Sequence, residues 1–103
     1  MKIGRYQLEN LIGEGIRFLF IDLRTPAERE EISDALFEKA MPLVFNELVE
    51  NLTTNEVSVD SPILLMDQTG ETVDPLVQDL EELGYKNVYV VRGGAREIAS
   101  PVH

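Results

Sequence analysis

The chain has 103 residues and a formal net charge of −10, from nine Lys and Arg against nineteen Asp and Glu. This acidity argues against nucleic acid and anionic membrane surfaces, which attract basic proteins, and agrees either with solubility alone or with a basic protein partner. The absence of cysteine excludes disulfides, thiolate catalysis and zinc–sulfur sites.

The length predicts a single domain over residues 1–103, since it suits one hydrophobic core and no Pro/Gly-rich linker or repeat divides it. The one histidine, His103, is the last residue, and we expect it to be disordered, with the ordered part ending at Pro101. No His-based catalytic dyad or metal cluster is therefore available, and we expect neither a metal nor a cofactor. No apolar run approaches a membrane span and the N-terminus lacks a signal-type apolar region, so we expect a cytoplasmic protein.

The first half of the chain predicts one buried strand between two helical segments. In order, the elements are a short helical stripe over 6–12, a strand over Phe18–Ile21, a helix over Pro26–Glu31 and a less regular segment over Ser33–Pro42. The run Phe18–Ile21 is short, apolar and aromatic-rich and leads into Asp22, as in a buried parallel strand. A capping box of Thr25 and Glu28, with Pro26 at the first helical position, predicts the helix that follows.

The second half alternates helices and strands. The apolar spacing predicts a helix over Asn46–Leu52, a polar loop over Thr53–Ser61, a strand over Ile63–Met66, a helical stripe from Val73 to Leu83, a strand over Val88–Val91 and a last turn over Ala95–Ile98. Strands that alternate with helices indicate right-handed βαβ units. We therefore predict an α/β fold whose mostly parallel sheet is covered by helices on both faces.

Three segments, in this order and spacing, resemble the rhodanese-like (sulfurtransferase-type) domain. Phe20–Glu28 resembles the family's strand followed by a "D-x-R-T-P-x-E" signature, and Ile63–Gly70 resembles the strand that leads into its active-site loop. Leu83–Gly94 resembles the family's ending, which closes on two glycines. The resemblance spans nearly the whole chain and implies a rhodanese-like fold.

The site loop departs from the family pattern. In the family, the loop begins with a cysteine that accepts sulfur as a persulfide, and its backbone N–H groups face an anion. Here the loop reads Asp67-Gln68-Thr69-Gly70-Glu71-Thr72, with Asp67 at the cysteine position and Thr72 where an arginine often ends the loop. The family's histidine-containing segment and late tryptophan are also missing, with Ser33–Ala35 and Ile98 nearest to them. A carboxylate cannot form a persulfide, so sulfur transfer at Asp67 is excluded.

Three interpretations of Asp67 remain open. Asp67 could accept the loop's own N–H groups and cap the following helix. It could act as a nucleophile, because the loop loosely resembles the "D-K-T-G-T" motif of aspartyl-phosphate enzymes; that chemistry also needs a lysine, and only Lys86 follows the loop. It could hold a cation together with Glu71 and Asp74, since hard cations take oxygen ligands. The same carboxylates would oppose an anionic ligand.

Three further residues are expected to support the loop. The resemblance implies that Asp22 and Arg24 form a structural ion pair near the end of their strand rather than a catalytic pair. Arg92 precedes the two glycines and either neutralises Asp67 or faces solvent.

The sequence therefore predicts a rhodanese-like domain that is inactive as a sulfurtransferase and serves as a regulatory or protein-interaction module. Its partner is expected to be another protein, with a basic one suggested by the net charge. The alternative is an enzyme of altered chemistry, phosphatase-like or metal-dependent, that uses Asp67.

Overall fold

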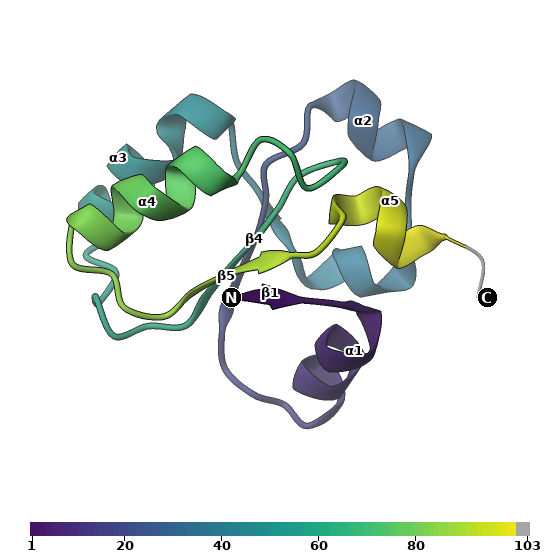
Figure 1. Ribbon diagram of the computed structural model, residues 1–103, viewed down its shortest axis with the longest axis horizontal. Coiled ribbons are helices and arrows are strands. Elements are labelled where there is room, and N and C mark those ends of the chain that lie inside the picture. The colour runs from purple at the N-terminus through teal and green to yellow at the C-terminus, as the bar shows by residue number, and fades with distance from the viewer. Residues whose placement is uncertain (101–103) are drawn as a thin grey trace.

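The computed structural model of the chain describes residues 1–100 and contains a five-stranded sheet (Figure 1). The strands are β1 (Lys2–Ile3), β2 (Leu19–Asp22), β3 (Met41–Pro42), β4 (Ile63–Met66) and β5 (Val88–Val91). Their order across the sheet is β1-β5-β4-β2-β3, and every neighbouring pair is parallel. The sheet is therefore fully parallel over the described residues, as the alternation of elements predicts.

Helices cover both faces of this sheet. They are α1 (Arg5–Gly13), α2 (Pro26–Glu31), α3 (Leu48–Thr54), α4 (Asp74–Glu82) and α5 (Gly94–Ala99), with two 3-10 helices, η1 (Ala35–Lys39) and η2 (Phe45–Glu47). Figure 1 shows α3 and α4 together on one face, with α1 and α5 on the other. None of the helices within residues 1–100 has the length and apolar character that a membrane crossing requires.

The alternation of side chains along β4 divides the apolar interior into two clusters. Ile63 and Leu65 join the cluster that includes buried leucines of α3 and α4. Leu64 and Met66 join the cluster that includes buried residues of α1 and α5. Both sets are buried because a central parallel strand meets helices on each face, which explains why its sequence is apolar without interruption.

The sequence predicts the longer elements well and the shortest ones poorly. The strands over Ile63–Met66 and Val88–Val91 and the helix over Pro26–Glu31 are confirmed with the predicted bounds. The first predicted strand starts one residue later, at Leu19, and β1 and β3 are missed because two residues leave no readable periodicity.

Two further corrections concern the segment before β4 and the end of the chain. The helix predicted over Asn46–Leu52 is a 3-10 turn followed by α3, which continues to Thr54 into the predicted loop. The predictions for Pro101 and His103 lie outside the described residues.

Arg5 holds the start of α1 against two neighbouring elements. Its Nη1 lies 2.8 Å from the Asp34 Oδ2, just before η1, and donates to the Ile98 carbonyl of α5 at 2.6 Å. Burial raises the pKa of Asp34, but hydrogen bonds from Arg5 and from the Leu36 N–H, together with the charge of Arg5, bring it below its ordinary value. The ionised form of Asp34 is thus favoured by folding.

We expect Asp34→Asn to lower the free energy of unfolding at pH 7 by about 1 kcal/mol, because the amide keeps the cap on η1 but loses the charge. The pKa of Asp34 is lower in the folded than in the unfolded chain, so its contribution is complete above the unfolded value of 3.8 and is lost as the pH falls through the folded value. Urea unfolding of wild type and Asp34→Asn between pH 7 and about pH 3 measures how their difference in unfolding free energy depends on pH. A difference between wild type and variant that grows toward low pH would contradict it, and Glu38→Gln, an exposed carboxyl on η1, is the control.

Candidate functional site

The candidate site lies at the carboxyl edge of the sheet, where β2 and β4 end side by side. Asp22 is in register with Met66, so the segments that follow, Leu23–Arg24 and Asp67–Gln68, leave the sheet side by side. From β2 the chain continues to β3 on one side, and from β4 it continues to β5 on the other. Open α/β sheets place their sites at such a reversal of strand order.

The Asp67 carboxylate is bound by its own loop. Its Oδ1 accepts the Gly70 N–H at 2.6 Å, and its Oδ2 accepts the Thr72 N–H at 2.8 Å and the Thr72 hydroxyl at 2.7 Å. Asp67 is 4% exposed, and these three donors compensate its removal from water. The prediction that Asp67 accepts loop N–H groups is confirmed.

The accompanying prediction, that Asp67 caps the next helix, is wrong. Helix α4 begins at Asp74 after the N-cap residue Val73, which makes no side-chain cap bond. The bonds of Asp67 end at Thr72, before the N-cap, so they close the loop rather than the first turn of the helix. Asp67 therefore stabilises the shape of the loop.

Arg24 joins the end of β2 to the loop. Its Nε and Nη2 each donate to one Asp22 carboxylate oxygen at 3.0 Å, which forms the buried ion pair that the resemblance implied. Its Nη1 donates to the Ile32 carbonyl at 2.6 Å and to the Gln68 Oε1 at 3.3 Å. The guanidinium thus connects the strand, the segment after α2 and the loop.

Gln68 bridges two charged side chains, a role that sequence reasoning missed. It is 6% exposed, accepts from Arg24, and donates through Nε2 to the Glu31 Oε1 of α2 at 3.2 Å. An amide can donate and accept at once, which suits a position between a cation and a carboxylate. The signal available in the sequence was its place directly after an apolar strand, beside Asp67.

Helix α5 packs directly under the loop. The Ala95 and Arg96 N–H groups donate to the carbonyls of Asp67 at 2.8 Å and Gln68 at 3.0 Å. A Cβ added to Gly94 would lie 2.6 Å from the backbone of the loop, and one added to Gly70 would lie 2.9 Å from the Gly93 nitrogen. Gly94 of the sequence motif and Gly70 of the loop therefore allow the two backbones to approach closely.

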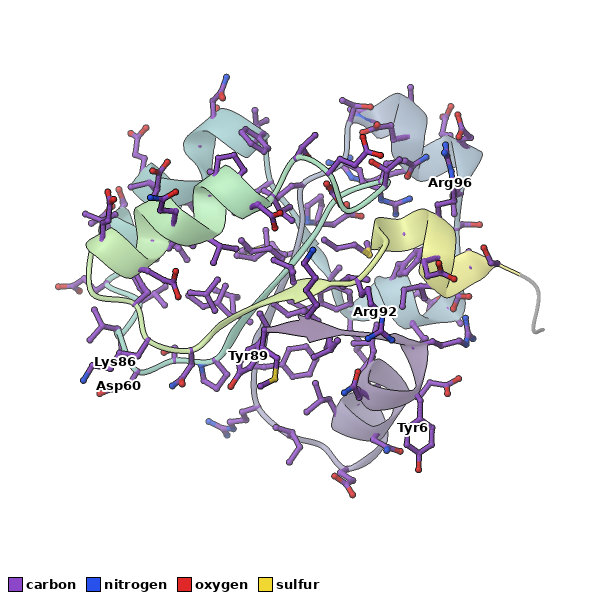
Figure 2. The ribbon with its side chains drawn as sticks, in the orientation of Figure 1. Tyr6, Asp60, Lys86, Tyr89, Arg92 and Arg96 are labelled. Atoms are coloured by element: carbon purple, nitrogen blue, oxygen red, sulfur yellow. The ribbon has the colours of Figure 1, made fainter. Side chains whose placement is uncertain are left out.

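Arg92 does not reach the loop. Its side chain is exposed and lies beside the start of α1 (Figure 2), where a Cβ on Gly4 would be 2.5 Å from the Arg92 Nη2. Within residues 1–100, no ion pair joins Arg92 to Asp67. The prediction that Arg92 neutralises Asp67 is wrong, and the alternative, an exposed arginine, is correct, since the Arg92 side chain lies beside Gly4 at the start of α1 and not beside Asp67.

The carboxylates near the loop do not assemble a metal site. In the part of the chain that the structure describes, no group of three or more His, Asp or Glu side chains is placed to hold a metal ion. Both oxygens of Asp67 accept hydrogen bonds from the loop, while Glu71 and Asp74 are exposed. The cation-site interpretation of these three residues is therefore wrong.

A comparison with protein-family models matches residues 5–100 to the rhodanese-like domain. The chain belongs to the rhodanese-like family. Among curated proteins, none matches it.

Solved structures show the same fold. Protein SSP1007 from Staphylococcus saprophyticus is 24% identical with a TM-score of 0.73, over 94% of this rhodanese-like chain and 91% of the other. The rhodanese-like domain of the Anabaena protein Alr3790 is 17% identical with a TM-score of 0.75, over 94% and 71%. A rhodanese-related protein from Thermoplasma volcanium is 23% identical with a TM-score of 0.69, over 94% and 88%.

We expect Gly94→Ala to destabilise this rhodanese-like domain more than Gly15→Ala. Both glycines have φ of +68°, so both variants carry the left-handed strain of about 1–2 kcal/mol. Only the methyl at 94 meets the loop backbone, since a Cβ at 15 has nothing within 4 Å among the described residues. In Gly94→Ala, overpacking then adds about 1–3 kcal/mol to the loss of unfolding free energy.

Urea unfolding of the two glycine variants measures the difference. Equal losses of unfolding free energy would show that α5 does not press on the loop. Amide hydrogen exchange at Gly70 and Thr72 should also quicken in Gly94→Ala and stay unchanged in Gly15→Ala.

Proposed function

We propose that this rhodanese-like domain does not transfer sulfur and acts as a protein-interaction module. The observation that carries the proposal is the carboxylate of Asp67, which is bonded to the Gly70 N–H, the Thr72 N–H and the Thr72 hydroxyl. In the family pattern that the chain resembles, the N–H groups of this loop face an anion. Here the chain supplies that anion itself, at the position of the reactive residue.

Sulfur transfer lacks both its nucleophile and its anion site. A persulfide forms on a thiolate, and the chain contains no cysteine. A thiosulfate oxygen that approached the loop would have to displace Asp67, which is tethered to the donors it occupies. Two like charges about 4 Å apart also repel by about 4 kcal/mol at an effective dielectric of 20, so the carboxylate opposes any oxyanion that comes close.

The alternative of an aspartyl enzyme is less well supported by the same contacts. A nucleophilic carboxylate needs an accessible oxygen, whereas Asp67 is 4% exposed and both oxygens accept hydrogen bonds. Lys86, the lysine that this chemistry would require, lies 3.7 Å from Asp60 (Figure 2). Both residues precede strands, at the edge of the sheet opposite the loop.

The charge distribution supports an interaction role with a basic protein. Between residues 40 and 85 the chain carries ten Asp and Glu and no Lys or Arg. This segment includes α3 and α4, which form one face of the domain (Figure 1), and all ten except Asp67 are exposed. A face of one charge sign favours encounter with a partner of the opposite sign.

The inactive reading predicts how Asp67→Cys behaves. Wild type should show no thiosulfate:cyanide sulfurtransferase activity. In Asp67→Cys the donors of Gly70 and Thr72 face a sulfur atom instead of a carboxylate. The thiolate should attack the outer sulfur of thiosulfate and release sulfite, so intact-protein mass spectrometry should show one added sulfur atom. Asp67→Ser, which frees the same donors without a thiol, is the matched control and should gain nothing.

Two results would count against this reading. Measurable turnover by wild type would refute inactivity, and an unmodified Asp67→Cys would show that the loop does not keep the geometry of a persulfide site. A phosphate adduct on wild type that is absent from Asp67→Asn would instead support the aspartyl enzyme.

The interaction role predicts that partner binding depends on α4. In a pull-down from the native cell extract, a partner identified by mass spectrometry should carry a basic surface. Reversing three exposed charges, Asp79→Lys, Glu81→Lys and Glu82→Lys, should weaken its affinity at least about tenfold, if each charge contributes about 0.5 kcal/mol. The control reverses three exposed carboxylates outside this face, Glu14, Glu30 and Glu38. Equal loss in both variants would refute docking on α4.

A further inference from the structure

A second concave site lies at the amino edge of the sheet, away from the loop. It is a cavity of about 440 Å³ between α1 and the first residues of the strands. Leu64, on the α1 face of β4, lines it and is 2% exposed. Leu11 of α1, Phe18 and Tyr89 line its walls, and Tyr89 lies on the α1 side of β5 (Figure 2).

The cavity exists because α1 packs loosely on the sheet. Leu8 is the one buried side chain among the nine residues of this helix. After the helix, Gly15 adopts a left-handed conformation, and Ile16 then forms part of the cavity wall while remaining 47% exposed. The cavity is open to solvent, because Gln7, Asn10 and Ile16, which line it, are exposed.

The lining has a defined chemistry. Among the described residues, no charged side chain lines the cavity, although 27% of the chain is charged. Two polar side chains, Gln7 and Asn10, lie on the α1 wall. The Gln7 Oε1 accepts the Gly4 N–H at 2.7 Å, while within residues 1–100 the Gln7 Nε2 and the Asn10 amide make no hydrogen bond. The walls therefore offer apolar area with free amide groups on one side only.

We propose that this cavity binds an uncharged, mainly apolar small molecule that carries one hydrogen-bonding group toward Gln7 and Asn10. Its volume falls in the range of about 300–1,000 Å³ that is usual for such sites. Burying apolar area contributes about 25 cal/mol per Å², and apolar walls with few polar partners hold water poorly. A charged ligand would lose its hydration without gaining a counter-ion.

The same lining disfavours a polypeptide as occupant. An inserted segment brings an N–H and a C=O with every residue, and each needs a partner when it leaves water. The cavity supplies two amide side chains, on one wall. Two amide side chains are enough to satisfy a small molecule with one polar group. They are too few for the backbone N–H and C=O groups of several residues.

The test uses N-phenyl-1-naphthylamine, an uncharged apolar probe with one N–H whose fluorescence rises in apolar surroundings. Titration of the whole protein should give saturable binding with one site per chain. Amide chemical shifts should move at Ile3, Leu64 and Tyr89, which line the cavity, and stay fixed at Gly70 and Thr72 in the loop. This map on wild type does not depend on any variant folding.

Ile16→Trp is designed to fill the cavity and should weaken probe binding at least about tenfold, a change of about 1.4 kcal/mol. Leu83→Trp is the matched control, because Leu83 is 52% exposed, close to the 47% of Ile16, and does not line the cavity. It should bind as wild type does. The unfolding midpoint of each variant verifies that both are folded.

Three outcomes would overturn the proposal. The first is no saturable binding, and the second is shifts that map away from the cavity or an equal affinity in both Trp variants. The third is a dimer in sedimentation velocity whose formation excludes the probe, which would make a second copy of the chain the occupant. Because the loop is untouched, failure here leaves the proposed function of Asp67 and α4 unaffected.

Discussion

The architecture of the site depends on one buried cation, the guanidinium of Arg24. Its Nε and Nη2 hold the Asp22 carboxylate, while its Nη1 binds the Ile32 carbonyl and the Gln68 amide oxygen. A planar group with five donors in fixed directions can satisfy these separate acceptors at once, which a lysine ammonium cannot do. Arg24 also lies over the Phe37 ring, 4.9 Å from its centre. Loss of this residue would leave the buried Asp22 with a weaker counter-ion, Arg29, whose Nε lies 3.8 Å from the Asp22 Oδ2 and makes no hydrogen bond to it.

In the loop beside Arg24, the Asp67 side chain satisfies the loop's own donors. A carboxylate and a bound oxyanion present similar acceptors to backbone N–H groups, so Asp67 meets the same donors from within the chain. The Asp67 carboxylate and a free oxyanion differ in the entropy of binding. The carboxylate is covalently part of the chain, whereas a free oxyanion loses translational freedom when it binds. The Gly70 and Thr72 N–H groups are thereby occupied by the chain's own carboxylate.

Sequence patterns predicted the strands and the ion pair of this site better than the contacts of its other side chains. The apolar runs that lead into Asp22 and Asp67 indicate two buried strands of a parallel sheet, and the motif around Arg24 implies its ion pair, whereas the adjacency of the two strands appears only in the structure. The direction of Arg92 was not readable, because a residue at the end of a strand can turn to either side and only the packing around Gly4 decides. The bridging role of Gln68 depends on a contact with α2, 37 residues away in the chain, which no local spacing records. The shortest strands were missed for the same reason, since their pairing with β5 and β2 is entirely non-local.

The contact between Gly94 and the loop has a consequence for how such a domain changes its chemistry. The backbone of α5 rests on the carbonyls of Asp67 and Gln68 and leaves no room for a Cβ. The length and path of the loop are therefore required by the packing of the last helix, whatever side chain stands at its first position. A reactive residue can be exchanged there for an inert one while the loop remains in place. The packing of α5 thus constrains the path of this loop independently of which side chain stands at position 67.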